Sequence, residues 1–259
     1  MNNLSLKELL DSYVEKYNQR DFIKDDPISI PHMFSDRRDI EIIGLWTAIL
    51  SWGLRKTIIN KSKELCVIMD HAPYDFIMNH TDKDLLRISQ FKHRTFNGTD
   101  ALCFVSFFKW YYKQWETLED AFLYESDESV SPMKNRIYHF FQLFTHSPDF
   151  IKRTRKHVAN PMTKSSCKRI NMFLRWMVRK DEKGVDFGLW NRIGMDQLMV
   201  PLDVHVYRVA RKLGLIKREQ TDWTTVELLT DKLRMLNPSD PVIYDYALFG
   251  MGIEAKTMP

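Results

Sequence analysis

Apolar residues recur at helical spacing from the start of the chain. Leu6, Leu9, Leu10 and Tyr13 fall three or four residues apart, so they share one face of a helix. The stretch 5–8, Ser-Leu-Lys-Glu, has the form of a capping box, in which the serine and the glutamate satisfy backbone N–H groups at a helix start. The pattern therefore predicts a first helix that begins with this box.

The same periodicity predicts further helices, separated by polar connections. They are expected at residues 39–52, 56–70, 82–89, 99–115, 131–145, 165–179, 204–213, 222–236 and 241–249. Side chains suited to cap these helices are Thr99 or Asp100, Ser131, Ser165 or Ser166, and Asp203. Gly214 is expected just after the end of the 204–213 helix. Residues 18–37, which are polar and contain two prolines, are predicted to form a long connection.

Strand signals are few and short, so the predicted class is an all-α fold of about ten helices. Residues 148–161 and 180–200 have no helical pattern and are the expected joints between domains. We expect one helical bundle domain at residues 36–180, ending in a hairpin and its helix. Residues 1–35 would join residues 181–259 in a second helical domain that carries Asp203.

Composition limits the kind of protein. The 259 residues are 44% apolar and 28% charged, an ordinary globular balance. The three cysteines, Cys66, Cys103 and Cys167, are too few for a disulfide framework or a four-cysteine cluster, and no His, Cys and carboxylate group has metal-ligand spacing. We therefore expect neither a metal nor a cofactor. No apolar run reaches the roughly 18 residues of a membrane span, and residues 1–8 lack the apolar core of a signal peptide, so we expect a cytoplasmic protein.

Positive charge is concentrated in one segment, although the net charge is only +4. Residues 152–183 contain eleven Lys and Arg, opposed only by Asp181 and Glu182. Such a concentration favours a polyanionic partner, nucleic acid above all. The alternative is a solvated helix face followed by a basic loop.

Residues 200–215 form the strongest local motif, in which an apolar lead-in delivers Asp203 to the start of a helix. Val206, Val209 and Ala210 would hold that helix against a core. The common role of an aspartate at this position is to cap the helix. A catalytic carboxylate in the same place is the less common alternative.

This segment resembles the aspartate-bearing stretch of the helix-hairpin-helix DNA glycosylases, which reads V-D-T-H-V-x-R. Two other stretches support the resemblance. Residues 41–61 are similar to the early helix and L-S-x-Q turn of endonuclease III-like enzymes, and residues 240–252 resemble the C-terminal helix of the archaeal 8-oxoguanine glycosylases. The whole chain more specifically resembles a bacterial family of unknown function, DUF2400. Four of that family's motifs occur here, at residues 168–179, 185–190, 201–206 and 244–252.

The glycosylase resemblance implies a two-domain all-α fold in which a cleft between the domains holds Asp203 as the catalytic acid. It also implies a hairpin that binds a DNA phosphate. The matching stretch, residues 160–168, has no glycine, so Lys164 and the hydroxyls of Ser165 and Ser166 would replace backbone N–H groups as phosphate ligands. Further expected DNA contacts are Arg169, Trp52, Arg55 and Arg208.

Bifunctional glycosylases also use a lysine that attacks C1′ of the flipped nucleotide. Lys168 is the best positional match and Lys164 the next. An alignment on Met172 and Phe173 places Asn171 there instead, which would exclude lyase chemistry. A phosphate-contacting or solvated lysine is the simpler interpretation of Lys168.

The resulting hypothesis is a monomeric DNA-repair glycosylase, with or without lyase activity, that removes a damaged base, such as an oxidised purine, from double-stranded DNA. A nucleic-acid-binding protein that kept the fold and lost the chemistry is the main alternative. A protein-interaction scaffold without a nucleic-acid role is a third.

Overall fold

The computed structural model describes residues 3–123 and 132–257, and within them the chain is mostly helical. Two compact units divide the chain, one made of residues 1–24 and 161–259 and the other of residues 25–160. We call them the terminal unit and the central unit. The all-α prediction is confirmed. The division lies after Asn160 and not at Lys180, because the helix between these two points is bonded to the terminal unit.

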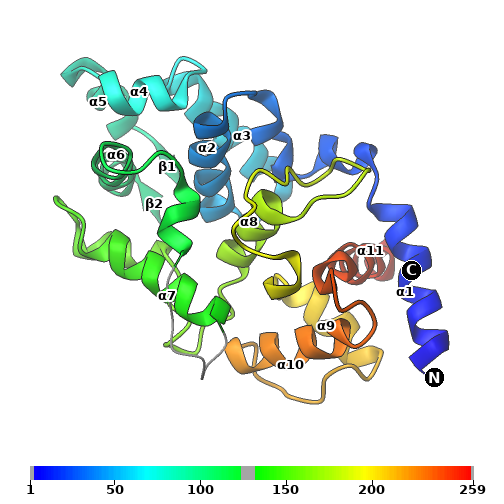
Figure 1. Ribbon diagram of the computed structural model, residues 1–259. Helices are drawn as coiled ribbons and strands as arrows, with labels where there is room; N and C mark the ends of the chain where they lie inside the picture. Colours follow the sequence, from blue (N-terminus) through cyan, green and yellow to red (C-terminus); the bar gives the residue numbers. More distant parts are fainter. Residues whose placement is uncertain (1–2, 124–131, 258–259) are drawn as a thin grey trace. The chain divides into compact units, whose positions relative to one another are not determined.

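The central unit is a helical bundle with one very short β-hairpin (Figure 1). Its α-helices are α2 (Arg37–Leu50), α3 (Arg55–Ile68), α4 (Pro73–Asn79), α5 (Asp82–Ser89), α6 (Gly98–Tyr112) and α7 (Pro132–Thr145). The hairpin pairs β1 (Lys92–His93) with β2 (Phe96–Asn97). Short 3₁₀ turns are η2 (Pro27–Ser29), η3 (Pro31–Met33), η4 (Leu118–Phe122) and η5 (Lys152–His157).

An aromatic core holds this bundle together. Trp46 of α2 lies against Phe104 and Phe108 of α6, and Phe104 also packs against Phe144 of α7 at 4.7 Å between ring centres. All four rings are fully buried. Such burial of large aromatic surfaces is the main stabilising contribution in a bundle of this size.

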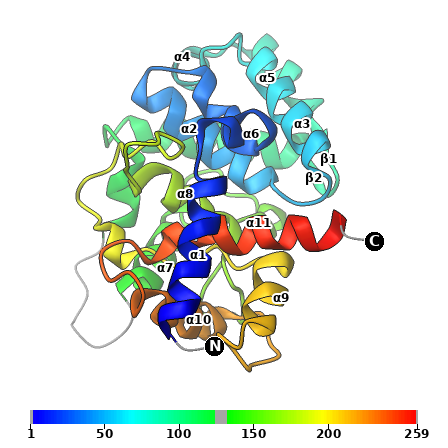
Figure 2. The same ribbon diagram turned by 90° about the vertical axis from the view of Figure 1, so that its right-hand side faces the viewer.

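The terminal unit brings together the first helix and the last third of the chain. It contains α1 (Asn3–Tyr17), α8 (Lys168–Val178), α9 (Val204–Lys212), α10 (Trp223–Arg234) and α11 (Tyr244–Thr257), with the 3₁₀ turns η1 (Arg20–Asp25), η6 (Met195–Gln197) and η7 (Pro241–Ile243). α1 crosses α11 at close range (Figure 2). Gly250 permits this approach, because a Cβ there would lie 2.2 Å from the ring of Tyr17. The hydroxyls of Tyr13 and Tyr17 both donate to Glu254 of α11.

Several predicted helix ends differ in the structure. α1 already includes Asn3, so the 5–8 box lies inside the first turn and does not start the helix. α6 is capped by Asn97, with Asp100 at the third helical position, so neither Thr99 nor Asp100 is the cap. α4 was not predicted. Ser131, the expected cap of α7, lies outside the described residues.

Candidate active site

Asp203 begins α9, as predicted, and its side chain caps the helix. Its Oδ1 accepts hydrogen bonds from the backbone N–H groups of His205 (2.7 Å) and Val206 (2.9 Å). Within the described residues Oδ2 accepts no hydrogen bond, and the side chain is half-buried. Asp203 therefore caps the helix with one oxygen and has the other available for a second role.

The rest of α9 is anchored as the pattern predicted. Val206, Val209 and Ala210 are buried, and Gly214 follows the helix with φ of +72°. Arg208 is exposed on the outer face. The helix is thus a rigid support for Asp203, fixed on one face by the core.

The loop before α8 lacks glycine but contains two residues in the left-handed region that glycine normally occupies. Lys164 has φ of +35° and Cys167 has φ of +50°. Neither serine caps α8, contrary to prediction. Ser165 Oγ accepts from the N–H of Cys167, and Ser166 Oγ donates to the carbonyl of Leu202 (3.3 Å). The two hydroxyls therefore shape the loop and tie it to the residue before Asp203.

Lys168 is the first residue of α8, and its side chain is half-buried with Nζ 3.6 Å from the sulfur of Met172. Asn171, the alternative in the nucleophile position, is buried and donates from Nδ2 to the carbonyl of Ser166 (3.1 Å). That bond gives Asn171 a role in holding the loop. Burial raises the pKa of the neighbouring Cys167 thiol to about 12, so this cysteine stays protonated and is a poor nucleophile.

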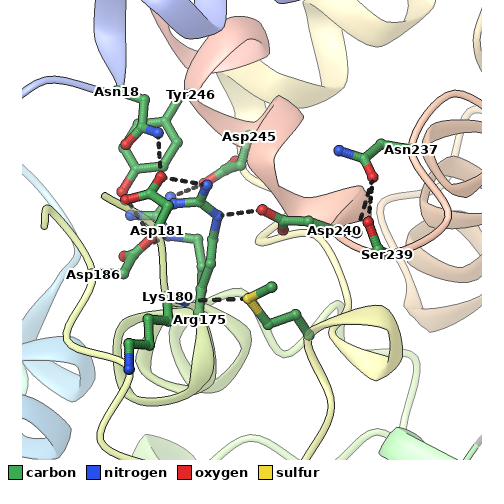
Figure 3. A network of polar contacts seen from close by, with 12 residues as sticks. Asn18, Arg175, Lys180, Asp181, Asp186, Asn237, Ser239, Asp240, Asp245 and Tyr246 are labelled. Atoms are coloured by element: carbon green, nitrogen blue, oxygen red, sulfur yellow. Dashed lines mark hydrogen bonds and ion pairs between the residues drawn. The ribbon is translucent and has the colours of Figure 1, made fainter. Parts of the chain in front are cut away.

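Arg175 of α8 and Arg179, which follows the end of that helix, form a buried network of ion pairs that the sequence analysis missed (Figure 3). Arg175 contacts Asp245 of α11 and, through Nε, Asp186 (3.2 Å). Arg179 bonds Asp240 (2.9 Å) and Asp186 (3.1 Å). Two further partners join the network, Asp181 on Arg179 and the hydroxyl of Tyr246 on Asp186.

The charges in this network shift one another's ionisation. Desolvation alone would lower the pKa of Arg179, but the carboxylates of Asp186 and Asp240 outweigh it and raise that pKa. Burial raises the pKa of Asp240 against the opposing effect of Arg179. For Asp245, burial raises the pKa to about 6, and the nearby charge of Asp203 adds to this while Arg175 and Lys168 oppose it.

The Asp245 carboxyl connects the two predicted catalytic residues to the network, because the charges of Asp203 and Lys168 both reach it. All three belong to the terminal unit. The structure therefore places Asp203 and Lys168 in one neighbourhood, together with a third ionisable group that was not predicted. The one sequence signal for it was the motif at residues 244–252, which contains Asp245.

The basic segment is less available to a partner than its composition indicates. At least four of its eleven cations are in ion pairs between described residues, namely Arg153 with Asp100, Lys183 with Glu15, and Arg175 and Arg179 within the buried network. Neither the polyanion-binding interpretation nor the solvated-face interpretation applies to the two buried arginines. The terminal unit nevertheless has 20 Lys and Arg against 16 Asp and Glu, while the central unit has 18 of each. The whole net charge of +4 therefore belongs to the unit that contains Asp203.

The remaining candidates for DNA contact differ in exposure and in the unit to which they belong. Lys164 is exposed, whereas Arg169 is half-buried, and burial lowers the pKa of its guanidinium to about 10. Trp52 and Arg55 belong to the central unit. Trp52 is half-buried and packs against His93, at 4.8 Å between ring centres, and against His157, at 5.9 Å. Arg55 is the first residue of α3.

Two further observations on the described residues concern metal-binding groups and membrane-spanning helices. Residues 3–123 and 132–257 contain no group of three or more His, Cys, Asp and Glu side chains placed to hold a metal ion. In the same ranges no helix has both the length and the apolar character that a bilayer span requires.

Comparison with known proteins gives one match. The model of a family described as "Protein of unknown function (DUF2400)" matches residues 26–254, which covers most of both units. No curated protein and no solved structure matches the chain. The resemblance to DUF2400 that the four motifs indicated is thus confirmed by a match over nearly the whole chain, and the chain belongs to the DUF2400 family.

Proposed function

We propose that this protein is a DNA glycosylase that removes a damaged base, with Asp203 as the catalytic carboxylate. The observation that carries the proposal is a difference between the two carboxylate oxygens of Asp203. Oδ1 accepts both capping bonds, and Oδ2 accepts none from the described residues. An oxygen fixed at a rigid helix start can stabilise the positive charge that develops at C1′ as the glycosidic bond breaks.

Two further features support the proposal. Lys168 begins the neighbouring helix and its charge reaches the same buried carboxyl as that of Asp203, so an amine lies near the acid. The net positive charge belongs to the same unit, as contact with a phosphate backbone requires. Either water or the Lys168 amine would attack C1′. Water would give a base-free site, and the amine would give a Schiff base.

The direct test is base release from a panel of duplexes, each carrying one lesion, with oxidised purines included. Asp203→Asn keeps a good helix cap, so unfolding free energy should fall by no more than about 1 kcal/mol. Base release should fall by at least about 100-fold, because an amide cannot carry the negative charge.

Asp222→Asn is the matched control, since Asp222 caps α10 in the same way and accepts from the N–H of Thr225 (3.1 Å). It should leave base release unchanged. If Asp203→Asn is as active as the parent, Asp203 is only a cap and the proposal fails. If no duplex loses a base but the protein binds DNA with strong salt dependence, a binding protein that retains the fold is the better description.

A further inference from the structure

Asp245 has an unusual position for an ionisable group. It lies in the first turn of α11 and is only 6% exposed, and its Oδ2 contacts Nη1 of Arg175. Arg175 is held in turn by Asp186 (3.2 Å). The carboxyl is therefore fixed within the core of the terminal unit, where it cannot meet a substrate but can act on groups nearby.

Three helices meet around this carboxyl. α8 supplies Arg175 and, seven residues or about two turns earlier on the same face, Lys168. α9 packs on α11, where a Cβ on Gly252 would meet His205 at 3.0 Å, and Asp203 begins α9. The charged groups that act on Asp245 from these elements and from the segment after α8 are Lys168, Arg175, Asp186 and Asp203. His205 of α9 faces α11 at Gly252, about two turns beyond Asp245.

We propose that Asp245 is a positioning residue that sets the charge on Lys168 from inside the core. The proposal rests on the proposed function in one respect, that Lys168 and Asp203 are the reactive groups. An ionised Asp245 stabilises the ammonium form of Lys168. A protonated Asp245 does not, so it favours the neutral amine.

The pKa of Asp245 determines the pH range over which its effect on Lys168 changes. Burial raises the pKa to about 6, with Asp203 adding to the rise and Arg175 opposing it. Asp245 therefore gains or loses its proton just below neutral pH. The chemistry proposed for Lys168 should then depend on pH through a residue that never touches DNA.

The effect of Asp245 on Lys168 can be tested by competitive acetylation of lysines with acetic anhydride, read by mass spectrometry on the full chain. The test needs no enzymatic activity. The reagent reacts only with neutral amines, and the exposed Lys164 of the same loop is an internal reference. Asp245→Asn mimics the protonated carboxyl. At pH 7.5 it should raise the Lys168 to Lys164 labelling ratio about threefold to tenfold, as loss of one close negative charge predicts.

Asp240→Asn is the matched control, because Asp240 is a buried aspartate of the same network but bonds to Arg179. It should leave the ratio unchanged. An unchanged ratio in a folded Asp245→Asn protein, or an equal change in Asp240→Asn, overturns the proposal.

The parent protein provides a second measurement if Asp245→Asn does not fold. Its Lys168 to Lys164 ratio should fall as pH rises through about 6, where Asp245 ionises, and a ratio that is flat across this range overturns the proposal. Failure of the glycosylase proposal is recognised separately, as the absence of base release from every lesion duplex.

Discussion

The hydroxyl of Ser166 donates to the carbonyl of Leu202 across 36 residues of sequence, at 3.3 Å. Each partner stands just before a predicted catalytic residue. Lys168 follows Ser166 by two positions, and Asp203 follows Leu202 by one. This bond joins the loop before α8 to the entry of α9, so the two helix starts are held together independently of the Arg175 network.

Borohydride trapping tests whether Lys168 is the nucleophile. A Schiff base between an amine and C1′ is reducible, so a bifunctional enzyme should give a covalent protein–DNA adduct. We expect the parent and Lys164→Gln to form it and Lys168→Gln to lose it. An adduct that survives both changes would identify another amine. Base release without any adduct would make water the nucleophile, and Lys168 would then be a phosphate contact.

The salt dependence of DNA affinity tests the exposed cations of the terminal unit. Lys164 and Arg208 are exposed, so replacing both by glutamine should reduce the slope of log affinity against log salt by about 2, at roughly 0.9 for each lost phosphate contact. Lys183→Gln is the control, because Lys183 is paired with Glu15. An equal effect of the control would mean that the slope reports overall charge and not a specific footprint.

The buried network predicts a large loss of stability when an arginine is removed. Arg179→Met would leave Asp186 and Asp240 buried without their counter-charge, so urea unfolding should show a loss of about 3–5 kcal/mol. Arg87→Met removes an arginine whose partners Asp70 and Asp84 lie at the surface, and its effect should be much smaller. Similar losses in the two variants would contradict the assigned role of Arg179.

The raised pKa of Asp245 predicts a pH dependence of stability. The folded state holds this proton more tightly than the unfolded state, whose pKa is 3.8, so this group's contribution to stability falls as pH rises from about 4 to 6. Asp245→Asn has no such proton. The difference in unfolding free energy between variant and parent should therefore increase in favour of the variant over this range and level off above pH 7. A difference independent of pH in urea titrations would show that Asp245 has an ordinary pKa.

Local patterns predicted the local structure well. α5 has the predicted bounds, and Asp203 caps the helix that it was expected to cap, because each signal lies within one turn of the residue that it governs. α8 is different. Its start is set by the left-handed Cys167, while the two serines next to it bond elsewhere. Propensity alone cannot show which partner a hydroxyl will take.

The site was predictable only in part for the same reason. Asp203 and Lys168 stand at helix starts that a motif can mark. One partner of Arg175 lies 70 residues away at Asp245, and a sequence gives no measure of which carboxylate will approach which guanidinium. On composition alone Arg175 and Arg179 counted toward a basic surface, yet both are buried.

The pairing of α1 with α11 has a consequence for the order of events during synthesis. Leu6 and Leu10 of α1 are buried, and α11 supplies much of the surface against which α1 packs. On the ribosome more than 200 residues separate the two helices, a delay of roughly ten seconds to a minute at about 5–20 residues per second. The central unit is complete long before α11 emerges. α1 therefore waits for α11 before its apolar face is buried, and the terminal unit must fold after translation has passed the middle of the given sequence.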